Sequence, residues 1–404
     1  MSSKMKTVII IPTYWTRERE RGIKLTDVIR DHPTPIDEVG TLGRAVLSLR
    51  DLEDRDYTLI VMAAASTESS RERTEKKVMN ILRRCCPQDV PTYVFSHPHL
   101  ELLKRYFKDA GGSEFLRLID IYGYSDMRNL SLILAQLLDA DLMISIDDDE
   151  YIRDPEFLKK ARENIGRRVD GTKVEGVTGY YVNPSGEYHL DSQDGEWVKY
   201  WNKSDAMNRA LDMLIPTPPR LKRAPFALGG CLVLGRRLME GIPFDPLIPR
   251  GEDADYLINA RMFGLDIFFD NQLRIGHDPP PKPHPLWRRF MIDAMRYVYE
   301  RQKLRTQKTV RVRPMDLDPY PGEFLKDDLD EKILRASTTI YKEYMEKGEE
   351  ESAEIVLDIP RMASQGTKLN PYTHLVELKE TWERLSGFIR DKGLSAHKDL
   401  FWKL

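Results

Sequence analysis

The sequence has few cysteines and no long apolar run. Its 404 residues include three cysteines: Cys85 and Cys86 are adjacent and Cys231 lies in an apolar run, so no disulfide framework is indicated. The longest apolar runs, at 8–11 and 59–65, are far shorter than the roughly 18 residues that a membrane-spanning helix needs. No segment of signal-peptide character follows the first residues. We therefore expect a cytoplasmic protein with no transmembrane segment.

An excess of charge of one sign is also missing. The formal net charge is -3, so charge gives no reason to expect a nucleic-acid partner. With 41% hydrophobic and 31% charged residues, the composition is that of an ordinary globular protein rather than a disordered or fibrous one. The length allows one substantial core with an appendage.

The N-terminal half alternates short apolar runs with helical patterns, which is typical of βαβ units and a mainly parallel sheet. Strands are expected at 7–11, 58–63, 92–95 and 142–146, and helices near 43–52, 70–84 and 128–138. From 174 to about 234 the pattern is strand-like and rich in aromatic residues. We predict an α/β class, with a Rossmann-like sheet.

A proline run at 279–283 suggests a domain edge. An amphipathic helix is expected from about Leu286 to Lys303, and the charged remainder is mostly helical. We therefore predict a catalytic domain over 1–285 and a mostly helical C-terminal extension over 286–404. The basic, aromatic first helix of that extension is expected to pack against the catalytic domain or a sister subunit, so a homo-oligomer through these helices stays open, as does contact with a membrane surface.

Four consecutive acids end the buried-strand pattern at 142–146: Asp147, Asp148, Asp149 and Glu150. In open α/β sheets, ligands bind beyond the carboxyl ends of the strands. Clustered carboxylates repel one another unless a cation is near, and their oxygens suit Mg²⁺ or Mn²⁺, which in turn bridges phosphate oxygens. The run therefore predicts a metal site that holds a diphosphate. The alternative is a solvated strand-to-helix loop whose acids cap a helix beginning at 154–156.

Two later segments add acidic and imidazole groups. Glu252 and Asp253 stand just ahead of a helical stretch at 256–263, and His277 follows a mostly apolar strand at 265–269, in a turn with Gly276 and Asp278. Taken alone, such a pair of acids is usually a helix cap and such a histidine is usually structural. Their order along the chain, after the acid run, makes the combined pattern more specific than any one of its pieces.

The ordered set resembles the family-two-like glycosyltransferases of the GT-A fold, from Thr7 to about His277. The matching pieces are the opening strand with 11–14, a helix start at Arg128-Asn129, the run at 147–149 that corresponds to the family's DXD motif, Gly229-Gly230 and Glu252-Asp253. The resemblance implies transfer of a hexose from a nucleoside-diphosphate sugar to an acceptor hydroxyl with the help of Mn²⁺ or Mg²⁺.

The same resemblance implies roles for individual residues. It implies metal ligands at Asp149 and His277, with Asp147 near the ribose or the metal. It implies donor-binding residues at Pro12, Thr13, Tyr14, Arg128, Asp147, Asp148, Gly229 and Gly230. Arg128, expected at a helix N-terminus, would contact the same phosphates as the metal.

Glu252-Asp253 resembles the family's acceptor motif, in which the aspartate takes the proton of the acceptor hydroxyl during inverting transfer. A carboxylate beside a second carboxylate has its pKa raised toward that of a useful base. We therefore prefer Asp253 as the base, with Glu252 beside it. A retaining GT-A glycosyltransferase of the small-solute, glycosylglycerate-type kind stays open, and so does a protein that binds a nucleotide sugar without turnover.

One departure concerns the base of the donor. The family's second strand commonly ends in an aspartate that contacts the base, whereas 63–66 here reads Ala-Ala-Ala-Ser. UDP-linked and GDP-linked donors are therefore both open, and the acceptor is unidentified. The segment 17–38 is longer than the family's usual first loop and is expected to be either a lid over the donor or an insertion.

Two other enzyme classes fit less well. A sugar-nucleotide pyrophosphorylase would need a glycine-rich phosphate loop after the first strand, where 12–15 reads Pro-Thr-Tyr-Trp. A metal-dependent phosphoesterase is suggested by His97-Pro98-His99, but these histidines stand in a proline-flanked segment without a carboxylate motif nearby.

Overall fold

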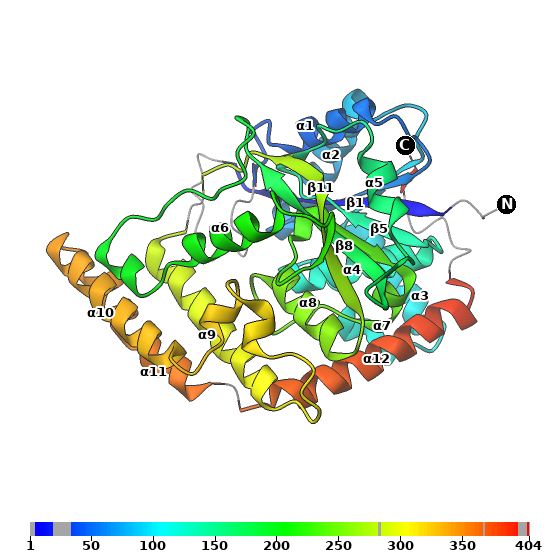
Figure 1. The fold of residues 1–404 in the computed structure, drawn as a ribbon. Helices are drawn as coiled ribbons and strands as arrows, with labels where there is room; N and C mark the ends of the chain where they lie inside the picture. The colour runs from blue at the N-terminus through cyan, green and yellow to red at the C-terminus, as the bar shows by residue number, and fades with distance from the viewer. Residues whose placement is uncertain (1–4, 19–33, 282–283, 367, 395–401, 404) are drawn as a thin grey trace.

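The computed structural model describes residues 5–18, 34–281, 284–366, 368–394 and 402–403 (Figure 1). Most of the long first loop at 17–38 and the end of the proline run at 279–283 fall outside these residues. Within them, a 12-stranded sheet runs through the molecule with its main strands in the order β12-β4-β3-β1-β5-β10-β8-β11-β6. Helices cover both faces of this sheet, and further helices lie beyond its end.

The first half of the sheet is parallel. It consists of β4 (Thr92–Phe95), β3 (Thr58–Ala65), β1 (Thr7–Thr16) and β5 (Leu142–Ser145), each paired in parallel with its neighbour. These strands read as nearly unbroken apolar runs because both faces are covered. Val8 and Ile10 pack on one side, against α3 (His97–Asp109) and α4 (Tyr124–Leu137). Ile9 and Ile11 pack on the other side, against α1 (Leu42–Ser48) and α2 (Arg71–Cys85).

The second half of the sheet is mixed. Strand β10 (Leu232–Gly235) pairs antiparallel with both β5 and β8 (Thr172–Val182), and β11 (Asp266–His277) then runs parallel to β8. Two successive reversals leave β8 and β11 pointing the same way as β1 and β5. Short strands complete the edges: β2 (Thr34–Pro35), β6 (Glu150–Tyr151), β7 (Arg168–Val169), β9 (Leu221–Arg223) and β12 (Trp402–Lys403).

The helices of the second half are α5 (Phe157–Glu163), α6 (Lys203–Leu214), α7 (Arg236–Gly241) and α8 (Glu252–Met262). The C-terminal part adds α9 (Leu286–Arg305), α10 (Leu329–Glu346), α11 (Glu350–Gln365) and α12 (Pro371–Asp391). An α/β fold with a mostly helical C-terminal part is thus confirmed. None of the helices in the described ranges is both long and apolar enough to cross a membrane.

Several predicted boundaries are wrong at the N-terminal ends of helices. Helix α4 begins at Tyr124, one turn before Arg128, because the Asp126 carboxylate accepts the Gly123 N–H at 3.2 Å and closes its first turn. Helix α8 begins at Glu252 rather than at 256, and α5 begins at 157 after a turn at 155–156. The segment 97–99 is the first turn of α3, not a loop, and α6 lies inside the segment expected to be strand-like.

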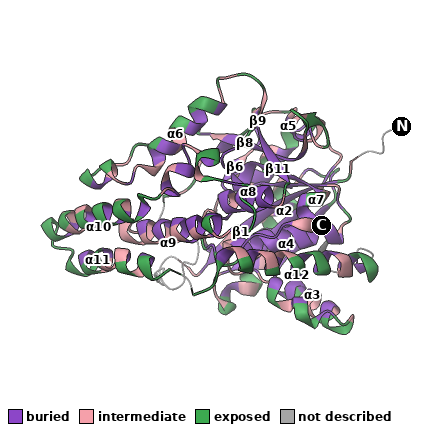
Figure 2. Ribbon diagram, turned by 60° about the horizontal axis from the view of Figure 1, so that its bottom comes forward, coloured by how far each residue is buried: buried purple, intermediate pink, exposed green. Residues whose placement is uncertain are grey.

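The C-terminal helices pack on the part of the chain that contains the sheet. Phe290 and Tyr297 of α9 are buried against Trp201, and α10 and α11 stack on the outside, where Figure 2 shows exposed outer faces. Helix α12 contacts α4, α7 and α9, and the fully buried Trp382 donates from Nε1 to the Met239 carbonyl at 2.9 Å. The aromatic face of α9 thus packs within the chain. The domain division at 285/286 and a homo-oligomer stay predictions.

A buried ion network joins α9 to α8. The Nζ of Lys303, which has no exposed surface, lies 2.6 Å from Asp255 Oδ1 and 3.1 Å from Asp245 Oδ2. It also donates to Asn259 Oδ1 at 3.0 Å, and the Tyr299 hydroxyl donates to Asp245 at 2.7 Å. These contacts anchor the helix whose first turn carries Glu252 and Asp253.

Candidate active site

A cavity of about 820 Å³ opens at the carboxyl edge of the sheet, within the roughly 300–1,000 Å³ typical of small-molecule sites. Because β1, β5, β8 and β11 run in the same direction, the residues at their ends meet at this edge. The cavity is lined by Tyr14 of β1, the acids 147–149 after β5, Tyr181 of β8 and His277 of β11. The start of α8 and one face of α9 form further parts of its wall.

The acid run folds back on itself. The Asp147 N–H donates to Glu150 Oε2 at 2.9 Å, and the Glu150 N–H donates to the Asp147 carbonyl at 3.1 Å. Glu150 then opens β6, which pairs antiparallel with the end of β11 so that Glu150 lies opposite His277. One expectation is therefore wrong, because Gly276 and His277 are the end of a strand rather than a turn. The acid run lies between β5 and α5, with the short strand β6 at its end.

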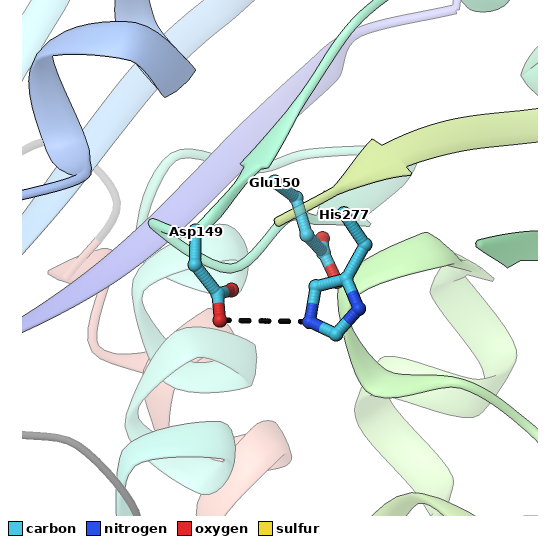
Figure 3. Close-up of side chains that lie close together, drawn as sticks. All are labelled: Asp149, Glu150 and His277. Atoms are coloured by element: carbon cyan, nitrogen blue, oxygen red, sulfur yellow. Dashed lines mark ion pairs between the residues drawn. The ribbon is translucent and has the colours of Figure 1, made fainter. Parts of the chain in front are cut away.

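This pairing gathers three side chains that offer metal-ligating atoms. Asp149, Glu150 and His277 each present one such atom, and the three atoms lie within 4.8 Å of one another (Figure 3). Asp149 Oδ2 is 3.5 Å from His277 Nε2. Asp149 and Glu150 are almost completely buried, and His277 is partly open to the cavity.

These residues fit a divalent cation. Glu150 Oε1 is buried without a hydrogen-bond partner among the described residues, which is costly for a carboxylate unless a cation or a proton satisfies it. Burial, and then the charges of Asp147 and Asp149, raise the pKa of Glu150 well above its usual range. Two carboxylates and an imidazole suit Mn²⁺, and the carboxylate oxygens suit Mg²⁺. The structure thus brings the predicted pair Asp149 and His277 together and adds Glu150, which the prediction did not include.

Asp147, the third predicted ligand, has another partner. Its Oδ1 lies 2.9 Å from Nη2 of the buried Arg128, which also donates from Nη1 to Ser145 Oγ at 2.6 Å and from Nε to Glu252 Oε1 at 3.2 Å. Arg128 therefore joins the end of β5 to the start of α8. It reaches this place from the second turn of α4, not from a helix N-terminus as predicted.

Asp148 is held by β1. Thr13, which is fully buried, donates from Oγ1 to Asp148 Oδ2 at 2.6 Å, while its neighbours Pro12 and Tyr14 line the cavity. Burial, and then the charge of Asp149, raise the pKa of Asp148 to about 8. Of the predicted donor-binding residues on β1, Pro12 and Tyr14 face the cavity and Thr13 supports the acid run from behind.

Gly229 and Gly230 lie behind the site rather than in the cavity wall. A Cβ on Gly229 would come within 2.5 Å of Arg128 Nη2, and one on Gly230 within 1.9 Å of Glu150 Oε1. Their N–H groups donate to Asp253 Oδ2 at 2.8 Å and to the Tyr181 hydroxyl at 3.0 Å, respectively. The small residues are needed here for close packing around the acids.

Glu252 and Asp253 form the first turn of α8 at the cavity wall. Asp253 also accepts from the Ala254 N–H at 2.8 Å, so both of its oxygens are held by backbone donors, and the residue is half-buried. Burial, and then the neighbouring charge of Asp253, raise the pKa of the Arg128-paired Glu252 to about 7. Asp253 thus stands at the cavity in a fixed orientation.

Sequence reasoning missed two supporting residues. Arg44 of α1 donates from Nη2 to the Asp149 carbonyl at 3.1 Å and pairs with the Asp278 carboxylate, which holds the end of β11 beside the acid run. The Tyr181 ring lies 4.6 Å from the His277 ring, and its hydroxyl accepts from Gly230. No motif marks Arg44, and Tyr181 is one of many aromatic residues in its segment.

No model of a known protein family matches the sequence, and no curated protein matches it. The solved structures that resemble the chain include the following three. A mannosyltransferase from Pyrobaculum calidifontis, PcManGT, solved with GDP-Man and Mn²⁺, is 12% identical, covers 99% of this chain and 88% of its own, and has a TM-score of 0.45. S. aureus TarS 1-349, solved with UDP, is 13% identical, covers 96% of this chain and 92% of its own, and has a TM-score of 0.38. Glucosyl-3-phosphoglycerate synthase from Mycobacterium tuberculosis, solved with Mn²⁺ and UDP-glucose, is 13% identical, covers 73% of this chain and 78% of its own, and has a TM-score of 0.37. Likeness at this level transfers no activity, so a function has to rest on this chain's own residues.

Proposed function

We propose that the protein is a metal-dependent glycosyltransferase that moves a hexose from a nucleoside-diphosphate sugar to an acceptor hydroxyl. One observation carries the proposal. Asp149 and His277, which form a cluster of metal-ligating atoms with the buried Glu150, line the same cavity as the fixed carboxylate of Asp253, at the carboxyl edge of an α/β sheet. A cation site for the diphosphate and a base for the acceptor are the two groups that such a transfer requires.

The cation would be held by Asp149, Glu150 and His277, with Mn²⁺ or Mg²⁺ as the candidates. When bound, it stabilises the charge that develops on the departing diphosphate. Arg128 keeps Asp147 and Glu252 in place on either side of the cavity, and Pro12 and Tyr14 supply part of the wall along which the donor lies.

For the acceptor, we propose that Asp253 takes the hydroxyl proton as the new glycosidic bond forms, which gives inversion at the anomeric carbon. The two backbone N–H groups that bind its oxygens fix the carboxylate's direction. Glu252 is buried and its Oε1 is already bonded to Arg128, so its carboxylate is the less accessible of the two to an acceptor hydroxyl.

The experiment is a donor screen in the absence of an acceptor. UDP-glucose, UDP-galactose, UDP-GlcNAc and GDP-mannose are incubated with the protein and Mn²⁺, and release of the nucleoside diphosphate is followed with and without EDTA. We expect slow, EDTA-sensitive hydrolysis of one donor. The anomeric proton of the freshly released sugar, observed by NMR before it equilibrates, should show inversion. Retained configuration would favour the retaining alternative, and binding without release would favour a non-catalytic protein.

A further inference from the structure

One face of α9 forms part of the cavity wall. Leu286, Arg289, Phe290, Asp293 and Arg296 all line the cavity, and their spacing of three and four residues places them on a single side of the helix. The helix that the sequence marks as the start of an appendage therefore contributes directly to the candidate active site.

This face is rich in cations. Arg289 and Arg296 line the cavity together with Lys203 from the start of α6 and Arg250 from the loop before α8. Asp293, on the same face of α9, pairs with Lys203, and Glu300, one turn beyond Arg296, lies 3.8 Å from Arg296 Nε. Burial acts to raise the pKa of Asp293, but the charges of Lys203, Arg250 and Arg296 outweigh it and hold that pKa at about 2. At least three cations therefore lie close to one carboxylate.

Two of the guanidinium groups have a buried N–H without a hydrogen bond. Arg296 is 2% exposed, and its Nε makes no hydrogen bond among the described residues and lies 3.8 Å from Glu300 Oε1. The Nε of Arg289 is also buried and makes no hydrogen bond among these residues. Buried guanidinium N–H groups without an acceptor are costly, because a guanidinium always carries its charge. We call Lys203, Arg250, Arg289 and Arg296 the cationic cluster.

The cationic cluster adjoins the proposed base. Arg296 Nη1 donates to the Gly251 carbonyl at 3.2 Å, and Gly251 directly precedes Glu252 and Asp253. Gly251 has a left-handed backbone, with φ of 74°, and a Cβ there would lie 1.8 Å from Arg296 Nη1. Glycine therefore lets the guanidinium lie directly against the turn that presents Asp253.

We propose that the cationic cluster is a subsite for an anionic group, a phosphate or a carboxylate, carried by the acceptor. The proposal rests on the proposed function, because Asp253 defines where the acceptor hydroxyl must lie. Arginine forks bind such groups through paired N–H donors. The acids at 147–149 form the wall for a cation-bound diphosphate, whereas the cationic cluster attracts an anion directly, without a metal.

Inorganic phosphate is the probe for this subsite. It is titrated by calorimetry into the full-length protein in EDTA, and again in Mg²⁺ with saturating GDP or UDP. We expect phosphate to bind in both conditions. Arg289→Gln should weaken phosphate binding about tenfold or more, the order expected for losing a charge-assisted contact. Arg288→Gln is the matched control, because Arg288 neighbours Arg289 on α9 but does not line the cavity. Arg250→Gln serves as a second variant if Arg289→Gln alters the melting temperature.

The outcomes separate the two proposals. The anion subsite is overturned if the wild type does not bind phosphate. It is also overturned if Arg289→Gln and Arg250→Gln bind phosphate as tightly as the wild type does. Mutual exclusion of phosphate and Mg²⁺–nucleotide assigns the cationic cluster to the donor and also overturns it. Failure of the nucleotide to bind even with Mg²⁺ or Mn²⁺, with phosphate binding intact, instead contradicts the proposed transferase.

Discussion

Replacing Gly230 by alanine should displace Glu150 and so weaken metal binding at the candidate site. A Cβ at this position would lie 1.9 Å from Oε1 and 2.1 Å from Oε2 of Glu150, so the whole carboxylate has to move. Glu150 is 1% exposed and its Oε2 accepts from the Asp147 N–H, which leaves it no free space to move into without breaking that bond. Overpacking of this kind costs about 1–3 kcal/mol of unfolding free energy. Displacement of a ligand or its support weakens metal affinity by roughly 10- to 100-fold.

The assay is Mn²⁺ binding followed by the loss of the free-ion EPR signal, with UDP and with GDP present, alongside urea unfolding. Gly387→Ala is the control, since Gly387 lies in α12 with nothing within 4 Å of its added Cβ, and alanine is favoured over glycine in a helix by about 1 kcal/mol. Glu150→Gln removes the charge without adding volume and should weaken Mn²⁺ binding too. Unchanged Mn²⁺ affinity in both Gly230→Ala and Glu150→Gln would refute the assignment of Glu150 as a ligand.

Three further substitutions test other parts of the site. Asp253→Asn should leave metal-dependent nucleotide binding intact while lowering the rate of sugar transfer by a factor of roughly 10² to 10⁴, the range for losing a general base. A normal transfer rate would exclude Asp253 as the base. His277→Ala should weaken Mn²⁺-dependent nucleotide binding by about 10- to 100-fold. The melting temperature should change little, because the side chain is 28% exposed at the end of a strand. A lower melting temperature with unchanged Mn²⁺ dependence would instead make His277 structural. Lys303→Met leaves the buried carboxylates of Asp245 and Asp255 unpaired and should lower the free energy of unfolding by about 3–5 kcal/mol, and a loss below about 1 kcal/mol in urea unfolding would contradict this account of the network.

The parallel half of the fold could be predicted because its strands are buried on both faces. Runs such as 7–11 and 142–146 are therefore almost entirely apolar, and the predicted strand at 92–95 agrees with β4 to the residue. The place of the acid run followed from the same logic, since a ligand site lies where such a strand ends. The helix starts were less accurate, because the cap that fixes α4 is an aspartate that accepts from the N–H of Gly123, five residues before the expected start of the helix at Arg128.

The composition of the site was less predictable than its location. Glu150 could not be told apart from its acidic neighbours by sequence, because its role depends on the pairing of β6 with β11, a long-range contact between two short segments. The exclusion of Asp147 from the cluster depends in the same way on Arg128. Helix α9 is expected from the sequence to pack against the catalytic domain or a sister subunit, but an amphipathic pattern does not show that part of its buried face lines the cavity.

The central claim is that a divalent cation joins the acid run to the diphosphate of the donor. Isothermal titration calorimetry with UDP and with GDP, in Mn²⁺ and in EDTA, tests it directly. The account predicts that at least one of the two nucleotides binds in Mn²⁺ and that its binding is lost or strongly weakened in EDTA, because the carboxylates of Asp149 and Glu150 offer a diphosphate no favourable contact without a cation between them. Equal affinity in the two conditions would contradict the metal bridge and return these acids to a purely structural role.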